Sequence, residues 1–238
     1  MGYTKDDVKE WLIRDIKDLS LLYTKQYVKY TGVIEGTREY YYDFIAKFLL
    51  SLDGKLDVYF ERNIPQIHRI PREDGFTYRV SDHILQEEKS IALSREKPLD
   101  EEWLAKSVLL DNFDYIGKII DYQIPINEKR TDKAGDVDLL AYNEKCFSLI
   151  ELKRENSTEP MLRAILEIST YFCQINRKTL KMDFSEYLIS DEELQKVILV
   201  FKDSIQHQDY IKSPYIRELT EKLKVNVFLF DNGKIIAP

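Results

Sequence analysis

Cysteine, histidine, glycine and proline are all scarce in this chain of 238 residues. The two cysteines, Cys146 and Cys173, lie in apolar surroundings without C-x-x-C spacing, which favours buried, reduced thiols in the cytoplasm. The three histidines are scattered and form no zinc-binding pattern. Only 8 glycines and 7 prolines accompany 44% hydrophobic residues, so the chain is not of a disordered class and can bury a sizeable core.

Long apolar runs and an excess of positive charge are also missing. A membrane span is not expected, because it needs about 18 or more consecutive apolar residues. The N-terminus is polar and acidic, unlike a signal peptide. The formal net charge of −7 argues against a protein that coats nucleic acid, because such binding depends on neutralising phosphates. An enzyme needs only a local basic surface, so this class remains open.

Hydrophobic periodicity divides the chain into an N-terminal α+β region, residues 1–95, and a second region, residues 96–238. The first region is predicted to contain helices at 5–23 and 37–52 and strands at 56–60 and 76–80, followed by a polar stretch. The loop between these strands carries His68, Arg69 and Arg72, which fit a solvated loop or a loop that faces DNA. The second region is predicted to contain helices at 100–120, 159–175 and 213–223 and strands at 122–126, 137–142, 147–152, 197–201 and 225–230, followed by a turn and a short final segment at 234–237. This order is typical of a mixed α/β domain.

The strand at 147–152 ends on charged side chains. Alternation places Phe147, Leu149, Glu151 and Lys153 on one face of the strand. A face that changes from apolar residues to Glu and Lys is unusual for a core, because a covered carboxylate needs a partner, a metal ion or water. The alternative is an ordinary surface hairpin with a Glu–Lys pair.

Asp138 lies on the preceding strand and can meet Glu151 across the hairpin. Two carboxylates held close together repel each other unless a cation lies between them, and a hard oxygen site of this kind suits Mg²⁺ or Mn²⁺. A bound metal ion can lower the pKa of a water molecule and polarise a phosphoryl oxygen. Lys153, two residues beyond Glu151, could stabilise the negative charge of a transition state.

The helix that follows is predicted to begin after Ser157 or Thr158 as its N-cap, with Pro160 in its first turn. Its polar side chains recur at helical spacing. They are either a solvated face with an Arg–Glu pair or a substrate-side stripe whose arginine binds phosphate, and the stripe consists of Arg163, Glu167, Tyr171 and Gln174.

These segments resemble the PD-(D/E)XK nuclease superfamily, which has a restriction-endonuclease-like fold with a mixed central sheet flanked by helices. The resemblance rests on Gly-Asp-Val-Asp-Leu-Leu at 135–140, Glu-Leu-Lys at 151–153 and Glu-x-x-x-Tyr at 167–171. Twelve residues separate Asp138 from Glu151, a normal hairpin length for the superfamily. Many relatives have Gln where this chain has Glu167, whereas Tyr171 matches. The resemblance covers the chain from about residue 100 onward.

The resemblance implies roles for individual residues. Asp138 and Glu151 would bind Mg²⁺, with the carbonyl oxygen of Leu152 as a third ligand, and Lys153 would assist hydrolytic attack. A carboxylate on the preceding helix would complete the metal shell; Glu102 is the first candidate and Glu101 the second. Asp136 competes with Asp138, which we prefer because Leu139 and Leu140 follow it directly, as in the superfamily pattern.

Three hypotheses follow for the function. The first is a Mg²⁺-dependent nuclease that hydrolyses phosphodiester bonds in a nucleic acid, with DNA as the expected substrate. The second is a nuclease-fold module that binds nucleic acid or protein without cutting, which the acidic charge and Glu167 favour. The third is that the acidic surface marks a protein partner and the N-terminal region is the interaction domain. That region could recognise the substrate, form a homodimer or pack on the catalytic core.

Overall fold

The computed structural model describes residues 2–52, 56, 60, 81–95, 100–126, 135–144, 146–175, 177–187 and 194–238. The fold is mixed α/β, as predicted, and is built on one sheet of seven strands. The strands lie side by side in chain order, and their bounds are β1 Asn112–Phe113, β2 Gly117–Pro125, β3 Asp136–Tyr142, β4 Phe147–Leu152, β5 Leu194–Phe201, β6 Val225–Asp231 and β7 Lys234–Ile236.

The pairing of neighbouring strands changes twice across the sheet, from antiparallel to parallel and back. Strands β1 to β4 form an antiparallel meander, while β4, β5 and β6 run parallel and β7 returns antiparallel to β6. Parallel neighbours need crossover connections. These are helical: α6 (Met161–Gln174) and α7 (Arg177–Asp183) connect β4 to β5, and α8 (Ile205–Lys212) and α9 (Pro214–Lys222) connect β5 to β6.

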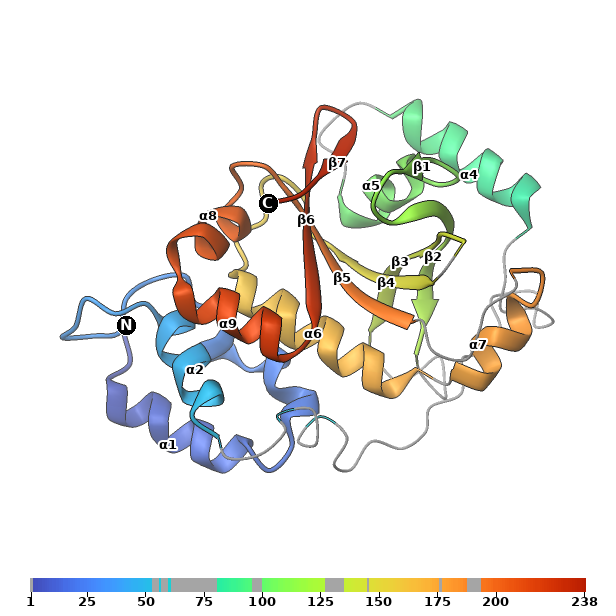
Figure 1. Cartoon of the computed structure of the whole chain (residues 1–238). Coiled ribbons are helices and arrows are strands. Elements are labelled where there is room, and N and C mark those ends of the chain that lie inside the picture. The colour runs from blue at the N-terminus through green and yellow to red at the C-terminus, as the bar shows by residue number, and fades with distance from the viewer. Residues whose placement is uncertain are drawn as a thin grey trace.

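Helices cover both faces of the sheet (Figure 1). On one face lie α6, α9 and the N-terminal elements, and on the other lie α4 and α5. The remaining elements are α1 Lys5–Asp15, the 3₁₀ helices η1 Leu19–Thr24 and η2 Gln26–Lys29, α2 Tyr41–Leu50, α4 Asp82–Leu93 and α5 Glu101–Ser107. No helix in the described part of the chain is both long enough and apolar enough to span a membrane.

Strand β4 contributes to a separate hydrophobic cluster on each side of the sheet. Phe147 and Leu149 pack into the cluster that contains α6, whereas Ile150 and Leu152 pack into the cluster that contains α5. The alternation predicted from the sequence is therefore confirmed. It directs Glu151 and Lys153 to the side of the sheet that α6 covers.

The described N-terminal elements share the larger hydrophobic cluster with the sheet. Val8, Leu22 and Ile45 belong to the same cluster as Leu149 and Ile165. Helix α2 packs on α9, and η1 packs on α6. Of the three roles considered for this region, packing on the core is the one seen in the structure. The larger hydrophobic cluster contains residues from both sides of the domain boundary predicted at residue 95. That boundary stays a prediction.

Several predicted helices have different bounds in the structure. The helix expected at 5–23 ends at Asp15, because the side chain of Asp18 accepts a hydrogen bond from Ser20 N and starts the 3₁₀ turn η1. The helix expected at 100–120 begins as predicted, with Asp100 as its N-cap, but ends at Ser107. Leu110 has a positive φ of 64°, and the following residues form β1 and β2.

Other elements were not predicted. Helix α4 occupies the stretch interpreted as polar, and α7 and α8 were missed. The reason is clear for α8, whose buried side chains are the polar Gln206 and Asp209 instead of an apolar stripe. The strand expected at 76–80 and the cluster of His68, Arg69 and Arg72 lie outside the described residues. Of the strand expected at 56–60, the structure describes only Leu56, in a turn, and Phe60, in helical conformation.

Helix α6 is capped by a residue distant in the sequence. Its N-cap is Pro160, not Ser157 or Thr158, and Pro160 cannot cap with its side chain. Instead, Met161 N donates a hydrogen bond to Asp209 Oδ2 at 3.0 Å. Beside it, Gln206 Nε2 donates to the carbonyl oxygen of Glu159 at 2.5 Å. Helix α8 therefore fixes the connection through which the chain passes from β4 to α6.

We expect Asp209 to make stability depend on pH. Burial raises its pKa to about 6, although hydrogen bonds from Met161 N and Tyr42 act in the opposite direction. A carboxyl group whose pKa is raised in the folded state stabilises the fold below its unfolded pKa, and this stabilisation, about 3 kcal/mol, is lost as the pH rises through about 6. Because this decline lies between the unfolded and the folded pKa, Asp209→Asn should reduce the fall in unfolding free energy between pH 4 and pH 7, measured by urea unfolding in chelator.

Asp209→Ala is the matched control. It also removes the charge, but it leaves Met161 N without its cap, so it should be about 1–2 kcal/mol less stable than Asp209→Asn at both pH values. If the Asn and Ala variants were equally stable, Asp209 would not cap α6.

Candidate functional site

Strands β3 and β4 bring Asp138 and Glu151 together. Their register pairs Leu140 with Leu149 and Leu139 with Ile150, so the next positions along the ladder are Asp138 and Glu151. Directly opposite residues of an antiparallel pair project from the same face. Asp138 also interacts with the backbone, because its Oδ2 accepts a hydrogen bond from Leu152 N at 2.7 Å.

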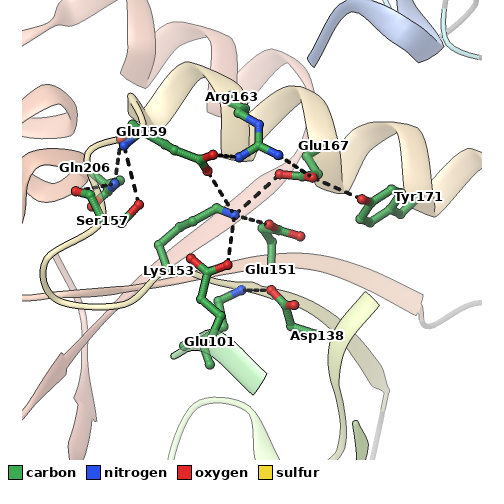
Figure 2. Close-up of polar contacts among 11 residues, drawn as sticks. Glu101, Asp138, Glu151, Lys153, Ser157, Glu159, Arg163, Glu167, Tyr171 and Gln206 are labelled. Atoms are coloured by element: carbon green, nitrogen blue, oxygen red, sulfur yellow. Dashed lines mark hydrogen bonds and ion pairs between the residues drawn. The ribbon is translucent and has the colours of Figure 1, made fainter. Parts of the chain in front are cut away.

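Lys153 lies at the centre of the site (Figure 2), and its ammonium group is surrounded by carboxylates. Nζ is 2.5 Å from Glu151 Oε1, which makes this the shortest of its ion pairs. Three further carboxylate oxygens lie within 4.0 Å: Glu159 Oε2 at 3.4 Å, Glu167 Oε2 at 3.5 Å and Glu101 Oε2 at 4.0 Å. We call Lys153, these four residues, Asp138 and Arg163 the Lys153 cluster.

Helix α6 covers the cluster from the side opposite the sheet and contributes Arg163 and Glu167 to it. Arg163 forms ion pairs with Glu159 and Glu167, one helical turn before and after it. Glu167 Oε1 also accepts a hydrogen bond from Tyr171 Oη at 3.0 Å. The stripe Arg163, Glu167 and Tyr171 predicted from the sequence therefore faces Lys153 and not solvent. Gln174, its fourth member, is only half-buried.

The cluster is buried and carries more carboxylates than cations. Glu151 and Lys153 are each 3% exposed, while the side chains of Glu101 and Glu159 form the more open rim. Five carboxylates face two cationic side chains, Lys153 and Arg163, among the described residues that form the cluster. Since burial disfavours an uncompensated charge, the excess has to be relieved by protonation of carboxyl groups or by a bound cation.

The pKa values follow from burial and from this imbalance. Burial raises the pKa of Asp138 to about 7, and the attraction of Lys153 offsets only part of the effect. Burial and the charge of Glu167 raise the pKa of Glu151 well above its ordinary value. For Glu167, burial is outweighed by Lys153 and Arg163, which lower its pKa. Burial would lower the pKa of Lys153, but Glu151, Glu167 and Asp138 raise it, so the ammonium group stays charged.

The structure separates the two candidates on the preceding helix. Glu102, our first candidate for the auxiliary carboxylate, turns away and forms an ion pair with Lys106 at 2.8 Å. Glu101, the second candidate, is the one that reaches Lys153. Asp136 is exposed at the start of β3, while Asp138 is partly buried within the cluster. These positions favour Glu101 over Glu102 and Asp138 over Asp136.

Sequence reasoning missed two contributors to the site. Glu159 contacts both Lys153 and Arg163, and it continues the spacing of the α6 stripe one turn toward the N-terminus, so this signal was present. Gln206 holds the backbone of Ser157 and Glu159 from α8. No sequence pattern pointed to Gln206, because the contact joins segments 47 or more positions apart.

The carboxylates converge on an ammonium group, not on a common metal position. Among the described residues, no group of three or more His, Cys, Asp or Glu side chains could hold a metal ion together. Comparison of the chain with family models, with curated proteins and with solved structures found no match. The chemistry of the site therefore has to be argued from its own residues.

A glycine makes room for the hydroxyl group of Tyr171. Gly135 precedes β3 with φ of +92°, and a Cβ atom there would lie 2.3 Å from Tyr171 Oη. Gly135→Ala should therefore displace Tyr171 from Glu167 in addition to straining the backbone. Gly233, with φ of +77° and open space around it, is the matched control for strain alone.

We expect Gly135→Ala to lower the unfolding free energy by about 1–3 kcal/mol more than Gly233→Ala does, because only the first overpacks a buried side chain. Urea unfolding of both variants measures the difference. Equal losses would mean that Tyr171 adapts without cost to an alanine at position 135.

Proposed function

We propose that the chain is a metal-dependent nuclease that hydrolyses phosphodiester bonds, with DNA as the expected substrate. The observation that carries this proposal is the position of Asp138, Glu151 and Lys153 together at the end of two adjacent strands. The mixed central sheet with helices on both faces is compatible with the architecture that the resemblance to the PD-(D/E)XK superfamily implies.

Asp138 and Glu151 would hold the metal ion. Mg²⁺ commonly binds proteins through only one or two carboxylates and keeps several water molecules, so two ligands from adjacent strands are enough. The surplus of carboxylates over cations fits a divalent ion, and Mn²⁺ has the same preference for oxygen ligands. The carbonyl oxygen of Leu152 is the proposed third ligand. When bound, the metal ion supplies an activated water and charge stabilisation at phosphorus.

Lys153 would provide the second element of the chemistry. Its ammonium group stays charged among the carboxylates, and it lies next to Glu151. A positive charge fixed beside the reacting phosphate stabilises the additional negative charge of the transition state. Glu159, Glu167 and Glu101 would hold the ammonium group in position from three directions. Arg163 is paired with Glu159 and Glu167, and it would exchange one of these partners for a substrate phosphate.

One observation favours a second function, a nuclease-fold module that binds a partner without cutting. The carboxylates close around Lys153 and leave it 3% exposed. In this alternative, the cluster is a buried ion-pair network with a purely structural role. The net charge of −7 fits this alternative as well. Metal binding separates the two functions, because a purely structural network has no place for a divalent cation.

Asp138→Asn should abolish stabilisation by metal. In the wild type, Mg²⁺ or Mn²⁺ at 100 times its dissociation constant should raise the unfolding free energy by about 2.7 kcal/mol. The variant should show no such increase, while its stability in chelator should equal or exceed that of the wild type, because a buried negative charge is removed. Thermal unfolding with chelator and with each metal measures both effects.

Asp136→Asn is the control, because Asp136 lies on the same strand but is exposed. It should keep the full metal response. Loss of the response in Asp136→Asn and its survival in Asp138→Asn would reverse the assignment of the ligand. A large loss of stability for Asp138→Asn in chelator would show that this carboxylate holds the fold together instead.

Cleavage of labelled single-stranded DNA, duplex DNA and RNA with Mg²⁺ or Mn²⁺ tests the activity directly. Lys153→Ala and Glu151→Ala should each lower kcat by at least about 100-fold, the size of effect seen when one charge-stabilising group is removed. Glu101→Ala should reduce kcat measurably, whereas Glu102→Ala should not, because only Glu101 reaches Lys153.

The outcomes of this assay are distinct. Cleavage that survives both Lys153→Ala and Glu151→Ala would come from another site or a contaminant. No cleavage of any substrate, together with no metal-induced stabilisation, would leave the non-catalytic module as the function. Equal effects of the Glu101 and Glu102 variants would remove Glu101 from the site.

A further inference from the structure

We propose that Tyr23, from the N-terminal region, is a positioning residue of the Lys153 cluster and acts through Tyr171 and Glu167. This inference deepens the proposed function and rests on it for its activity readout. It gives the described N-terminal region a specific role, because η1 would then form part of the site.

The contact begins where η1 packs on α6. The rings of Tyr23 and Tyr171 meet edge to face, with their centroids 5.8 Å apart. Both side chains are buried, Tyr23 at 8% and Tyr171 at 3% exposure. Their hydroxyl groups are hydrogen-bonded to each other, and the charges of Glu167, Arg163 and Glu151 act on the Tyr23 hydroxyl group.

The direction of the hydrogen bonds follows from the number of protons. A tyrosine hydroxyl group has one proton to donate. Tyr171 donates its proton to Glu167 Oε1, at 3.0 Å. In the hydrogen bond between the two tyrosines, Tyr23 must therefore be the donor and Tyr171 the acceptor. Successive hydrogen bonds of this kind polarise and strengthen one another, so the Tyr23 hydroxyl group strengthens the bond from Tyr171 to Glu167.

Glu167 connects this chain of hydrogen bonds to Lys153. Its Oε1 atom is held by Tyr171 and Arg163, which leaves Oε2 directed at Lys153 Nζ, 3.5 Å away. Gly135 packs directly against the Tyr171 hydroxyl group, because a Cβ atom at position 135 would collide with that group. Tyr171 is thus confined by η1, by the start of β3 and by its own helix. Removing the Tyr23 hydroxyl group releases one of these constraints.

Another buried tyrosine in the same region serves as a matched control. Tyr27, in η2, is 4% exposed, and its hydroxyl group donates a hydrogen bond to Asp15 at 3.0 Å. Its partner lies within the N-terminal region and has no contact with the Lys153 cluster among the interactions described. Tyr27→Phe therefore removes a buried hydroxyl group and a hydrogen bond without affecting Tyr171.

The first measurement does not depend on activity. The ¹⁵N resonance of the Lys153 ammonium group, assigned by its disappearance in Lys153→Arg, reports the surroundings of Nζ. We expect Tyr23→Phe and Tyr171→Phe to shift this resonance in the same direction and Tyr27→Phe to leave it unchanged. A resonance that is unaffected by Tyr23→Phe would overturn the proposal, whether or not the protein cleaves nucleic acid.

The second measurement uses cleavage kinetics. Tyr23→Phe should lower kcat about tenfold with KM unchanged, the effect typical of a residue behind the reacting groups. Because Tyr23 acts through Tyr171, the double variant Tyr23→Phe/Tyr171→Phe should lose no more activity than Tyr171→Phe alone. Losses that multiply in the double variant, or an equal loss in Tyr27→Phe, would contradict the proposal. A wild type without activity would instead count against the nuclease function, and the resonance of Lys153 would still test the role of Tyr23.

Discussion

The burial of a single ammonium group constrains the architecture around it. An uncompensated charge in the protein interior is strongly unfavourable, so Lys153 requires carboxylates on every side from which water is excluded. These come from four parts of the chain: Glu151 from β4, Glu159 from the connection, Glu167 from α6 and Glu101 from α5. The relative positions of the sheet and of two helices are therefore tied to one side chain.

The cluster is not the arrangement that stability alone would favour. Glu151 alone would neutralise the lysine, yet Glu167 and Asp138 lie beside it too, and the pKa values of Asp138 and Glu151 are raised. Buried groups whose ionisation is this strongly perturbed tend to occur at functional sites. Structural ion-pair networks perturb ionisation too, but here five carboxyl groups accompany two cationic side chains among the described residues of the cluster. This surplus is what connects the packing of the fold to the proposed metal chemistry.

Local sequence patterns predicted the parts of the structure that local interactions determine. The alternation along β4 and the N-cap at Asp100 needed only neighbouring residues, and both are confirmed. The helix expected at 100–120 was too long, because apolar residues such as Ile119 and Ile120 suit a helix or a buried strand equally well. The choice between Glu101 and Glu102 depended on the rotation of a helix that the sequence does not specify. Contacts of Gln206 and Asp209 join distant segments, which no periodicity reveals.

The long-range cap of α6 also constrains the order of folding. The first turn of α6 is completed by Asp209, 48 positions later in the chain, so the connection that carries Glu159 cannot be fixed until α8 is in place. Contacts of high sequence separation form late, because the entropy of closing the loop must be lost first. During synthesis, a chain that has emerged only as far as β5 would have all the charged residues of the cluster but not their arrangement. The cluster would thus assemble only after the sheet has received its C-terminal helices, and incomplete chains would lack its arrangement.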